Sequence, residues 1–227
     1  MPVATPNEGP ELQSQALLFI GAKAKARILD VGSGVGRFVK MMNRFGYDNA
    51  LGIDPFLDQS AERPHVRRSD IQSVKGIYDV ILFNHCFEHM TEPEAALKRC
   101  GDLLSPSGTV VVHIPNPHSR EFEKFKQDWW GLHAPYHFAL PSRKGTELMA
   151  ARCGFKVADA VCTSRYDHYL YSDDYRRNIP DKDLNSVRRK LENETFDKTL
   201  WSSLSKLAYS LNKTLEGDWI AYYLVRD

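Results

Sequence analysis

The chain has 227 residues, of which 42% are hydrophobic, so it is long enough to bury the core of one domain over residues 1–227. Its 30 Lys and Arg residues balance 29 Asp and Glu residues, and no net field therefore favours nucleic acid or an anionic membrane as a partner. No run of about 18 apolar residues predicts a membrane span, and no N-terminal apolar stretch predicts secretion. We therefore expect a cytoplasmic protein, in which four cysteines without a CxxC pair stay reduced.

Short apolar segments alternate with helical periodicities from about residue 27 to 162. This alternation predicts the α/β class, with a mostly parallel sheet. The expected strands are 27–31, 49–53, 65–68, 78–83, 109–114 and 155–161, and a last strand is expected at 218–226. Several of these segments are apolar at successive positions, which indicates strands covered on both faces by helices.

Three crossover helices are expected between the strands. The first has an apolar stripe at helical spacing, formed by Val35, Phe38, Val39, Met42 and Phe45. Thr91 and Glu94 form a capping-box pattern before a second helix, whose stripe is Ala96, Leu97, Cys100, Leu103 and Leu104. A third helix is expected over about 142–153. Residues 163–216 then form a helical insertion before the last strand, with a polar stretch followed by apolar stripes at 184–191 and 196–211; a packed appendage, a dimer surface and an acceptor lid all remain open for it.

A glycine-rich turn, RILDVGSGVGRF, joins the first strand to the first helix, with glycines at Gly32, Gly34 and Gly36. Unpaired backbone N–H groups and a helix N-terminus at such a turn favour an anion. The dinucleotide fingerprint needs its third glycine where this chain has Arg37, and Asp30 would repel a pyrophosphate but attract an ammonium group. The ligand should carry both charges, as the methionine end of S-adenosylmethionine does.

Further acids follow the next two expected strands. Asp54 ends the second strand, where its carboxylate can accept hydrogen bonds from both ribose hydroxyls. Asp70 and Ile71 follow the third strand, where they can bind the adenine amino group and cover the ring.

With these residues in place, the ordered motifs ILDVGSGVGRF, GIDP, SDI, YDVILFNHCFEHM and LLSPSGTVVVHIPN resemble the class I S-adenosylmethionine-dependent methyltransferases. The resemblance implies a Rossmann-like seven-stranded sheet of order 3-2-1-4-5-7-6, with the last strand antiparallel. It implies cofactor contacts at Asp30, Gly32, Ser33, Gly34, Gly36, Asp54, Pro55, Asp70, Ile71, Asn84 and His85. The stretch from Trp129 to Phe155 is similar to a bacterial subgroup associated with methylation of surface polysaccharides and other small molecules.

The segment HCFEHM spaces His85, Glu88 and His89 in a way that resembles an inverted zinc-peptidase motif. That motif must lie on a helix, whereas this segment leaves a strand, so we predict neither a peptidase nor a metal. The ubiquinone-pathway O-methyltransferases are similar in carrying Glu-x-x-Glu-His here. A loose divalent site at these three residues is therefore the alternative.

Methyl transfer from a sulfonium needs alignment, desolvation and, for a hydroxyl acceptor, a base. Among the histidines between 85 and 137 we favour His137 as the base, followed by His89 and His113, and we expect Trp129, Trp130 and Tyr136 to form an apolar wall. The predicted function is methyl transfer to a hydroxyl of a small molecule or glycan, with S-adenosylhomocysteine as product. A non-catalytic cofactor-binding subunit, and transfer to nitrogen or carbon, are the alternatives; a homodimer remains open.

Overall fold

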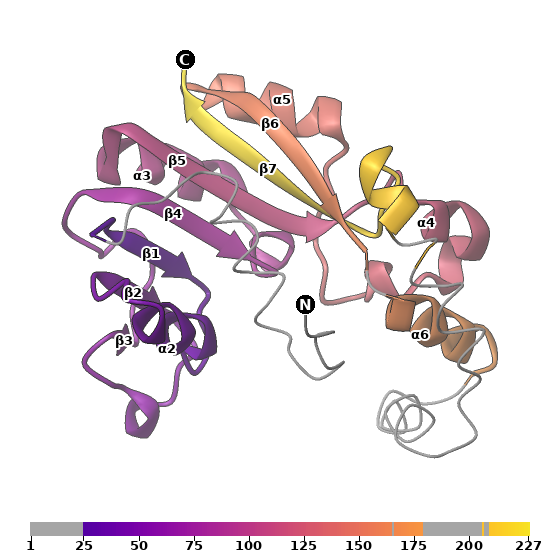
Figure 1. Ribbon diagram of the computed structural model, residues 1–227, viewed down its shortest axis with the longest axis horizontal. Coiled ribbons are helices and arrows are strands. Elements are labelled where there is room, and N and C mark those ends of the chain that lie inside the picture. Colours follow the sequence, from indigo (N-terminus) through magenta and orange to yellow (C-terminus); the bar gives the residue numbers. More distant parts are fainter. Residues whose placement is uncertain (1–24, 165, 179–205, 207–208) are drawn as a thin grey trace.

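The computed structural model describes residues 25–164, 166–178, 206 and 209–227. Seven strands form one sheet of order β3-β2-β1-β4-β5-β7-β6 (Figure 1). The strands are β1 Ile28–Val31, β2 Ala50–Ile53, β3 Val66–Arg67, β4 Tyr78–Asn84, β5 Leu104–Pro115, β6 Phe155–Thr163 and β7 Trp219–Arg226. Pairing is parallel from β3 to β5, and β7 runs antiparallel to both of its neighbours. The predicted fold class and strand order are confirmed.

Both faces of the central sheet are buried. Val110, Val111 and Val112 follow one another in β5 and are each at most 1% exposed, as expected for a strand that packs on both sides. Helices α3 (Pro93–Leu103) and α5 (Arg143–Arg152) contribute to the core on one face, and α2 (Arg37–Arg44) contributes to the core on the other. Figure 1 shows these helices on opposite sides of the sheet.

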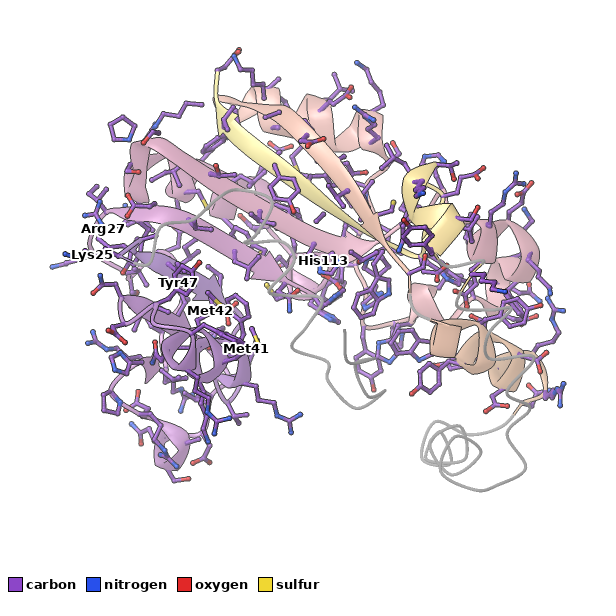
Figure 2. The ribbon with its side chains drawn as sticks, viewed as in Figure 1. Lys25, Arg27, Met41, Met42, Tyr47 and His113 are labelled. Carbon is purple, nitrogen blue, oxygen red and sulfur yellow. The ribbon has the colours of Figure 1, made fainter. Side chains whose placement is uncertain are left out.

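Helix α2 is shorter than its apolar pattern predicted. Phe38, Val39 and Met42 are buried against the sheet, and Met42 is labelled on this helix in Figure 2. Val35 and Phe45, however, are 64% and 68% exposed. Their assignment to the buried stripe was wrong, because the helix begins at Arg37 and ends at Arg44, so both residues lie outside its regular turns.

Helix α3 has the expected buried stripe but not the expected start. Glu92 occupies the N-cap position with no side-chain capping bond, and Pro93 is the first helical residue. A proline suits this position because it has no N–H group to satisfy. The capping box of Thr91 and Glu94 was therefore wrong. At the other end, β5 begins at Leu104 directly, so the SPSG segment lies within the strand instead of in a turn.

Several short helices beyond the sheet were not expected. Helix α4 (Arg120–Phe125) and helix α6 (Tyr166–Arg176) pack together past the carboxyl end of β5 (Figure 1). The 3-10 turns are η1 Gln59–Ala61, η2 Phe87–His89, η3 Lys126–Asp128 and η4 Trp130–Leu132. In the predicted insertion, α6 and the helical residues 209–213 are described, whereas the stripe at 184–191 and most of that at 196–211 lie outside the described residues.

Two expectations concern the chain as a whole: free cysteines and the lack of a membrane-spanning helix. Cys86, Cys100, Cys153 and Cys162 are all free thiols, as predicted. Within the same described part of the chain, no helix combines the length and the apolar character that crossing a membrane requires.

Candidate active site

A cavity of about 1030 Å³ opens where β1, β2, β3 and β4 end. In a parallel sheet this edge collects the loops that follow the strands, which is where ligands bind in open α/β folds. The predicted residues that line the cavity are Gly32, Asp54, Pro55, Asp70, Ile71, His85 and His89. Asp30, Ser33, Gly34, Gly36, Asn84, His113 and His137 are not among its lining residues.

The glycine turn has a φ of 72° at Gly32, in the left-handed region that glycine tolerates. A Cβ atom at this position would lie 2.4 Å from Cβ of Cys86, so the two segments approach too closely for any side chain. The Cys86 thiol donates to the carbonyl oxygen of Val31 at 2.9 Å, which joins the end of β4 to the end of β1. Gly32 is therefore required by packing as well as by conformation.

The backbone N–H groups of this turn are satisfied within the protein. Those of Gly32 and Ser33 donate to the carbonyl oxygen of Ile53, at 2.8 and 3.0 Å, and that of Gly36 donates to the carbonyl oxygen of Ser33. Gly34 donates to Asp54 at 2.9 Å. The expectation of unpaired amides at these four positions was wrong. The turn provides a close backbone approach at the cavity and does not offer these amides to an anion.

Asp54 is held rigidly at the cavity wall. Its Oδ2 accepts the N–H of Gly34 and its Oδ1 accepts the N–H of Phe56, at 2.9 and 2.8 Å. A carboxylate oxygen has more than one acceptor position, so each oxygen keeps capacity for a further hydroxyl donor. Asp70 is similarly fixed, since its Oδ1 accepts the N–H groups of Gln72 and Ser73.

Asp30 lies behind the cavity lining and is 3% exposed. Burial, and secondarily the neighbouring charge of Asp54, raise the pKa of this carboxyl to about 8. A nearby cation would relieve both effects. The site is therefore electrostatically suited to a ligand with a positive group close to Asp30.

Glu88, His89 and His137 form a cluster beside the cavity. His137 Nε2 lies 4.0 Å from Glu88 Oε1, and the rings of His89 and His137 are 4.7 Å apart between centroids. Two backbone bonds hold the loop that carries His137 in place, because Phe138 and Ala139 donate to the carbonyl oxygen of Glu88 at 2.8 and 3.4 Å. The structure thus brings together His137 and His89, the first two of the three candidate bases.

Burial shifts the ionisation of this cluster. Glu88 is 1% exposed, and its desolvation raises the pKa of its carboxyl. Desolvation also lowers the pKa of His137, against the opposing influence of its bond to Gly131 and of Glu88. Both shifts favour the neutral form of the group concerned.

His113 does not join this cluster. It is 2% exposed, with Nδ1 2.9 Å from Asn84 Oδ1 and Nε2 3.1 Å from Thr163 Oγ1. Figure 2 labels it near the carboxyl ends of the central strands. Because His113 is buried, lies outside the cavity lining and has protein partners at both ring nitrogens, we remove it from the candidate bases.

None of the three residues of the expected aromatic wall, Trp129, Trp130 and Tyr136, lines the cavity. Trp129 is 2% exposed and packs against Phe122, so its assignment to the wall of a binding site was wrong. Tyr136 is 62% exposed, and Trp130 packs against Tyr171 of α6.

Among the lining residues that the sequence analysis did not assign to the site are Cys86, Met90 and Phe138. The HCFEHM segment contains Cys86 and Met90, so its position after β4 was the available signal. No local pattern marks Phe138, which reaches the cavity only because its loop is bonded to Glu88.

The sheet order and the position of the cavity are those of the class I S-adenosylmethionine-dependent methyltransferases. Solved structures share this fold. An S-adenosylmethionine-dependent methyltransferase from Archaeoglobus fulgidus aligns over 96% of this chain and 95% of its own, with a TM-score of 0.59 and 16% identity. One from Geobacter sulfurreducens, in complex with S-adenosyl-L-homocysteine, aligns over 100% and 94%, with a TM-score of 0.57 and 13% identity.

Sequence comparison gives the family. The family described as "Methyltransferase domain" matches residues 8–160, so this chain belongs to that family, and the predicted enzyme class, a methyltransferase, is confirmed. A ubiquinone biosynthesis O-methyltransferase from Rhodopseudomonas palustris (strain TIE-1) is 31% identical over 108 residues, 42% of each chain. One from Acinetobacter baumannii (strain AYE) is 28% identical over 117 residues, 45% of this chain and 49% of the relative. The chain thus matches less than half the length of these relatives.

Proposed function

We propose that this protein transfers a methyl group from S-adenosylmethionine to a hydroxyl oxygen of a small molecule. The observation that carries the proposal is one cavity lined both by Gly32, Asp54 and Asp70 and by His89. The first three are the positions at which the sequence motifs predict cofactor contacts. The last belongs to the cluster that can act on an acceptor.

In this proposal each acid meets a different part of the cofactor. Asp54 accepts the ribose hydroxyls, for which its oxygens keep acceptor capacity beside the bonds from Gly34 and Phe56. Asp70 and Ile71 border the adenine ring. Asp30 faces the ammonium group, whose positive charge stabilises the buried carboxylate.

The transfer itself is an in-line displacement. The acceptor oxygen forms a bond to the methyl carbon while the carbon–sulfur bond breaks, and its electron pair remains on sulfur as the thioether S-adenosylhomocysteine. The hydroxyl proton must leave before or during this step. We assign its removal to the cluster of Glu88, His89 and His137, because these are the titratable groups that the structure gathers beside the cavity.

Oxygen is preferred to nitrogen or carbon as the acceptor atom because an alcohol or phenol needs such activation. The relatives named as O-methyltransferases of ubiquinone biosynthesis support the same choice. A glycan hydroxyl meets the same chemical requirement as a small phenol, and an acceptor panel should include both.

Two measurements test the proposal. Calorimetric titration should show S-adenosylhomocysteine binding at one site per chain. Incubation with isotopically methyl-labelled S-adenosylmethionine and a panel of phenols, catechols and glycosides should transfer label to oxygen. Failure of both cofactor forms to bind at millimolar concentration would defeat the proposal. Binding without transfer to any acceptor would favour the non-catalytic alternative, and label on nitrogen or carbon would correct the acceptor atom.

A further inference from the structure

The imidazole of His89 is fixed in one tautomer by its backbone partner. Its Nδ1 lies 2.9 Å from the carbonyl oxygen of Tyr136. A carbonyl oxygen can only accept, so Nδ1 must carry the hydrogen in this bond. In the neutral ring the lone pair is then on Nε2, which is left to face a ligand.

His137 has the same arrangement. Its Nδ1 lies 2.8 Å from the carbonyl oxygen of Gly131, so the lone pair of the neutral ring is again on Nε2. That atom is 4.0 Å from Oε1 of Glu88, a carboxylate oxygen that is also an acceptor. With His137 neutral and Glu88 ionised, two acceptor atoms thus face each other, and the other nitrogen near Oε1 is Nδ1 of His85 at 3.7 Å.

The second carboxylate oxygen of Glu88 is a further acceptor. The side chain is 1% exposed, and its Oε2 has no hydrogen-bond partner among the described residues. A buried acceptor without a donor is destabilising, and more so when it is charged. One ligand atom from each of Glu88, His89 and His137 lies within 4.8 Å of the others, so a single cation could satisfy all three.

We propose that Glu88, His89 and His137 bind one divalent transition-metal ion of the Zn²⁺ type. Two imidazole nitrogens and one carboxylate oxygen form a donor set for zinc, manganese or iron, whereas magnesium and calcium prefer oxygen ligands alone. Three protein ligands leave at least one coordination position open, as in catalytic metal sites. This proposal differs from the predicted absence of a metal, and also from the alternative set, because His137 takes the place given to His85.

The surroundings fit such a site. Histidine ligands of metals usually donate their other ring N–H to a carbonyl or carboxylate, which orients the ring, and both histidines here do so. Ligand atoms around a tetrahedral zinc are roughly 3.3 Å apart for bonds of about 2.0 Å, so the three side chains must approach by about an ångström. His89 is exposed, and it can move towards the other two ligands together with the Tyr136 carbonyl oxygen that holds its ring.

The metal would take part in the reaction at the cavity that His89 lines. With a metal bound, the cluster would act through the ion instead of as a base. An acceptor hydroxyl at the open position would have a lowered pKa, and its proton would leave to solvent as the oxygen attacks the methyl carbon. This catalytic part rests on the proposed function, whereas the metal site itself does not.

The test uses the full chain, stripped with a chelator and then titrated with Co²⁺ alone as a spectroscopic probe. We expect about one equivalent to bind, with the visible absorption of a low-symmetry Co²⁺ site, and Zn²⁺ to displace it. His137→Ala and His89→Ala should each weaken Co²⁺ binding by about 100-fold or more. His118→Ala, which removes an exposed histidine outside the cluster, should bind Co²⁺ as the wild type does.

His89→Ala is the safer variant for folding because this side chain is exposed, and thermal melts of both variants establish that they are folded. S-adenosylhomocysteine binding is measured on the same samples. Protein that binds S-adenosylhomocysteine but takes up no Co²⁺, or binds it equally after either substitution, would overturn the metal site while leaving the proposed function intact. Full methyl transfer by the chelated protein would overturn the catalytic part of the proposal, and the Co²⁺ titration alone would then decide the metal site. Protein that binds Co²⁺ but not S-adenosylhomocysteine would support the site and defeat the proposed function.

Discussion

The two sides of the candidate site are built in different ways. The cofactor side consists of residues that follow β1, β2 and β3 directly, so the sheet itself fixes their positions. The acceptor side consists of a loop around His137 that reaches the sheet through bonds to a distant segment. Positions set by a sheet edge can be found from sequence spacing, whereas positions set by a few long-range bonds depend on the folded chain.

The largest expected effect is on the cofactor side, where packing is tightest. Gly32→Ala should destabilise the protein by about 2 to 5 kcal/mol, since it adds left-handed strain to a contact of 2.4 Å with Cys86. Gly34→Ala is the matched control: its φ is 52°, but no atom lies within 4 Å of the added Cβ, so it should cost only about 1 to 2 kcal/mol. Urea unfolding of both variants measures the difference. Equal losses would show that conformation alone, and not contact with Cys86, requires glycine at 32.

The next effect concerns the ribose assignment. Asp54→Ala should weaken S-adenosylhomocysteine binding by about 2 to 4 kcal/mol, roughly 30- to 1,000-fold, because two bonds to a charged acceptor are lost. Asp58→Ala removes an exposed carboxylate four residues further on, whose bonds go to Ser60, and should leave the affinity unchanged. Calorimetry on both variants decides the point, and an unaltered dissociation constant for Asp54→Ala would refute the assignment.

On the acceptor side we expect an effect on turnover without one on cofactor affinity. His137→Ala should lower the rate of methyl transfer about 100-fold or more, whether the imidazole acts as a base or as a metal ligand. His118→Ala should retain wild-type turnover, since that side chain is exposed outside the cluster. Single-turnover rates with saturating S-adenosylmethionine measure this directly. Wild-type turnover by His137→Ala would remove the loop from the mechanism and break the contrast between the two sides.

The smallest expected effect is the release of a proton when the cofactor binds. Below pH 8 the buried Asp30 carboxyl is protonated in the free protein, and the cofactor ammonium should convert it to the carboxylate, releasing up to one proton. Affinity for S-adenosylhomocysteine should therefore rise about tenfold from pH 6 to 7. Calorimetry in buffers of different ionisation enthalpy counts the proton. Asp30→Asn should abolish both the proton release and the pH dependence; a wild-type protein with neither would contradict the ammonium assignment.

The same group predicts a stability change of known sign. The folded pKa of Asp30, about 8, lies above the ordinary value of 3.8 for this carboxyl, so the folded state binds the extra proton between these pH values. The corresponding contribution to stability is complete below about pH 4 and is lost as the pH rises to about 8. The unfolding midpoint of the free Asp30→Asn variant should consequently fall less than that of the wild type over this range.

Sequence reasoning placed the strands because each is an apolar run that packs on both faces, as Val110 to Val112 illustrate. It failed where a local pattern competed with geometry. Thr91 and Glu94 have the capping spacing, yet Pro93 sets the helix start. Helix α4 was missed because it is short, and α6 falls in the polar stretch of the predicted insertion, where no apolar stripe marks a helix. Both pack on each other and on the turn η3, beyond the sheet.

The candidate site divides along the same line. Asp54, Asp70 and Gly32 were found from their spacing after strands. His137 was named from its residue type and its place in the chain. Its proximity to Glu88 could not be inferred, since 49 positions separate the two residues and only the bonds of Phe138 and Ala139 bring them together. The hydrogen bonds of the turn amides could not be predicted either, because they depend on how Ile53 and Asp54 are placed relative to the glycines.

The carbonyl oxygen of Glu88 connects the acceptor side of the site to the cofactor side. It fastens the His137 loop to the short segment that begins at His85 and Cys86, which border the cavity. If one ligand displaces that segment, the affinity of the protein for the other ligand changes, and thermodynamic linkage requires the influence to be mutual. We expect the methyl donor and the acceptor to alter each other's affinity by one common factor.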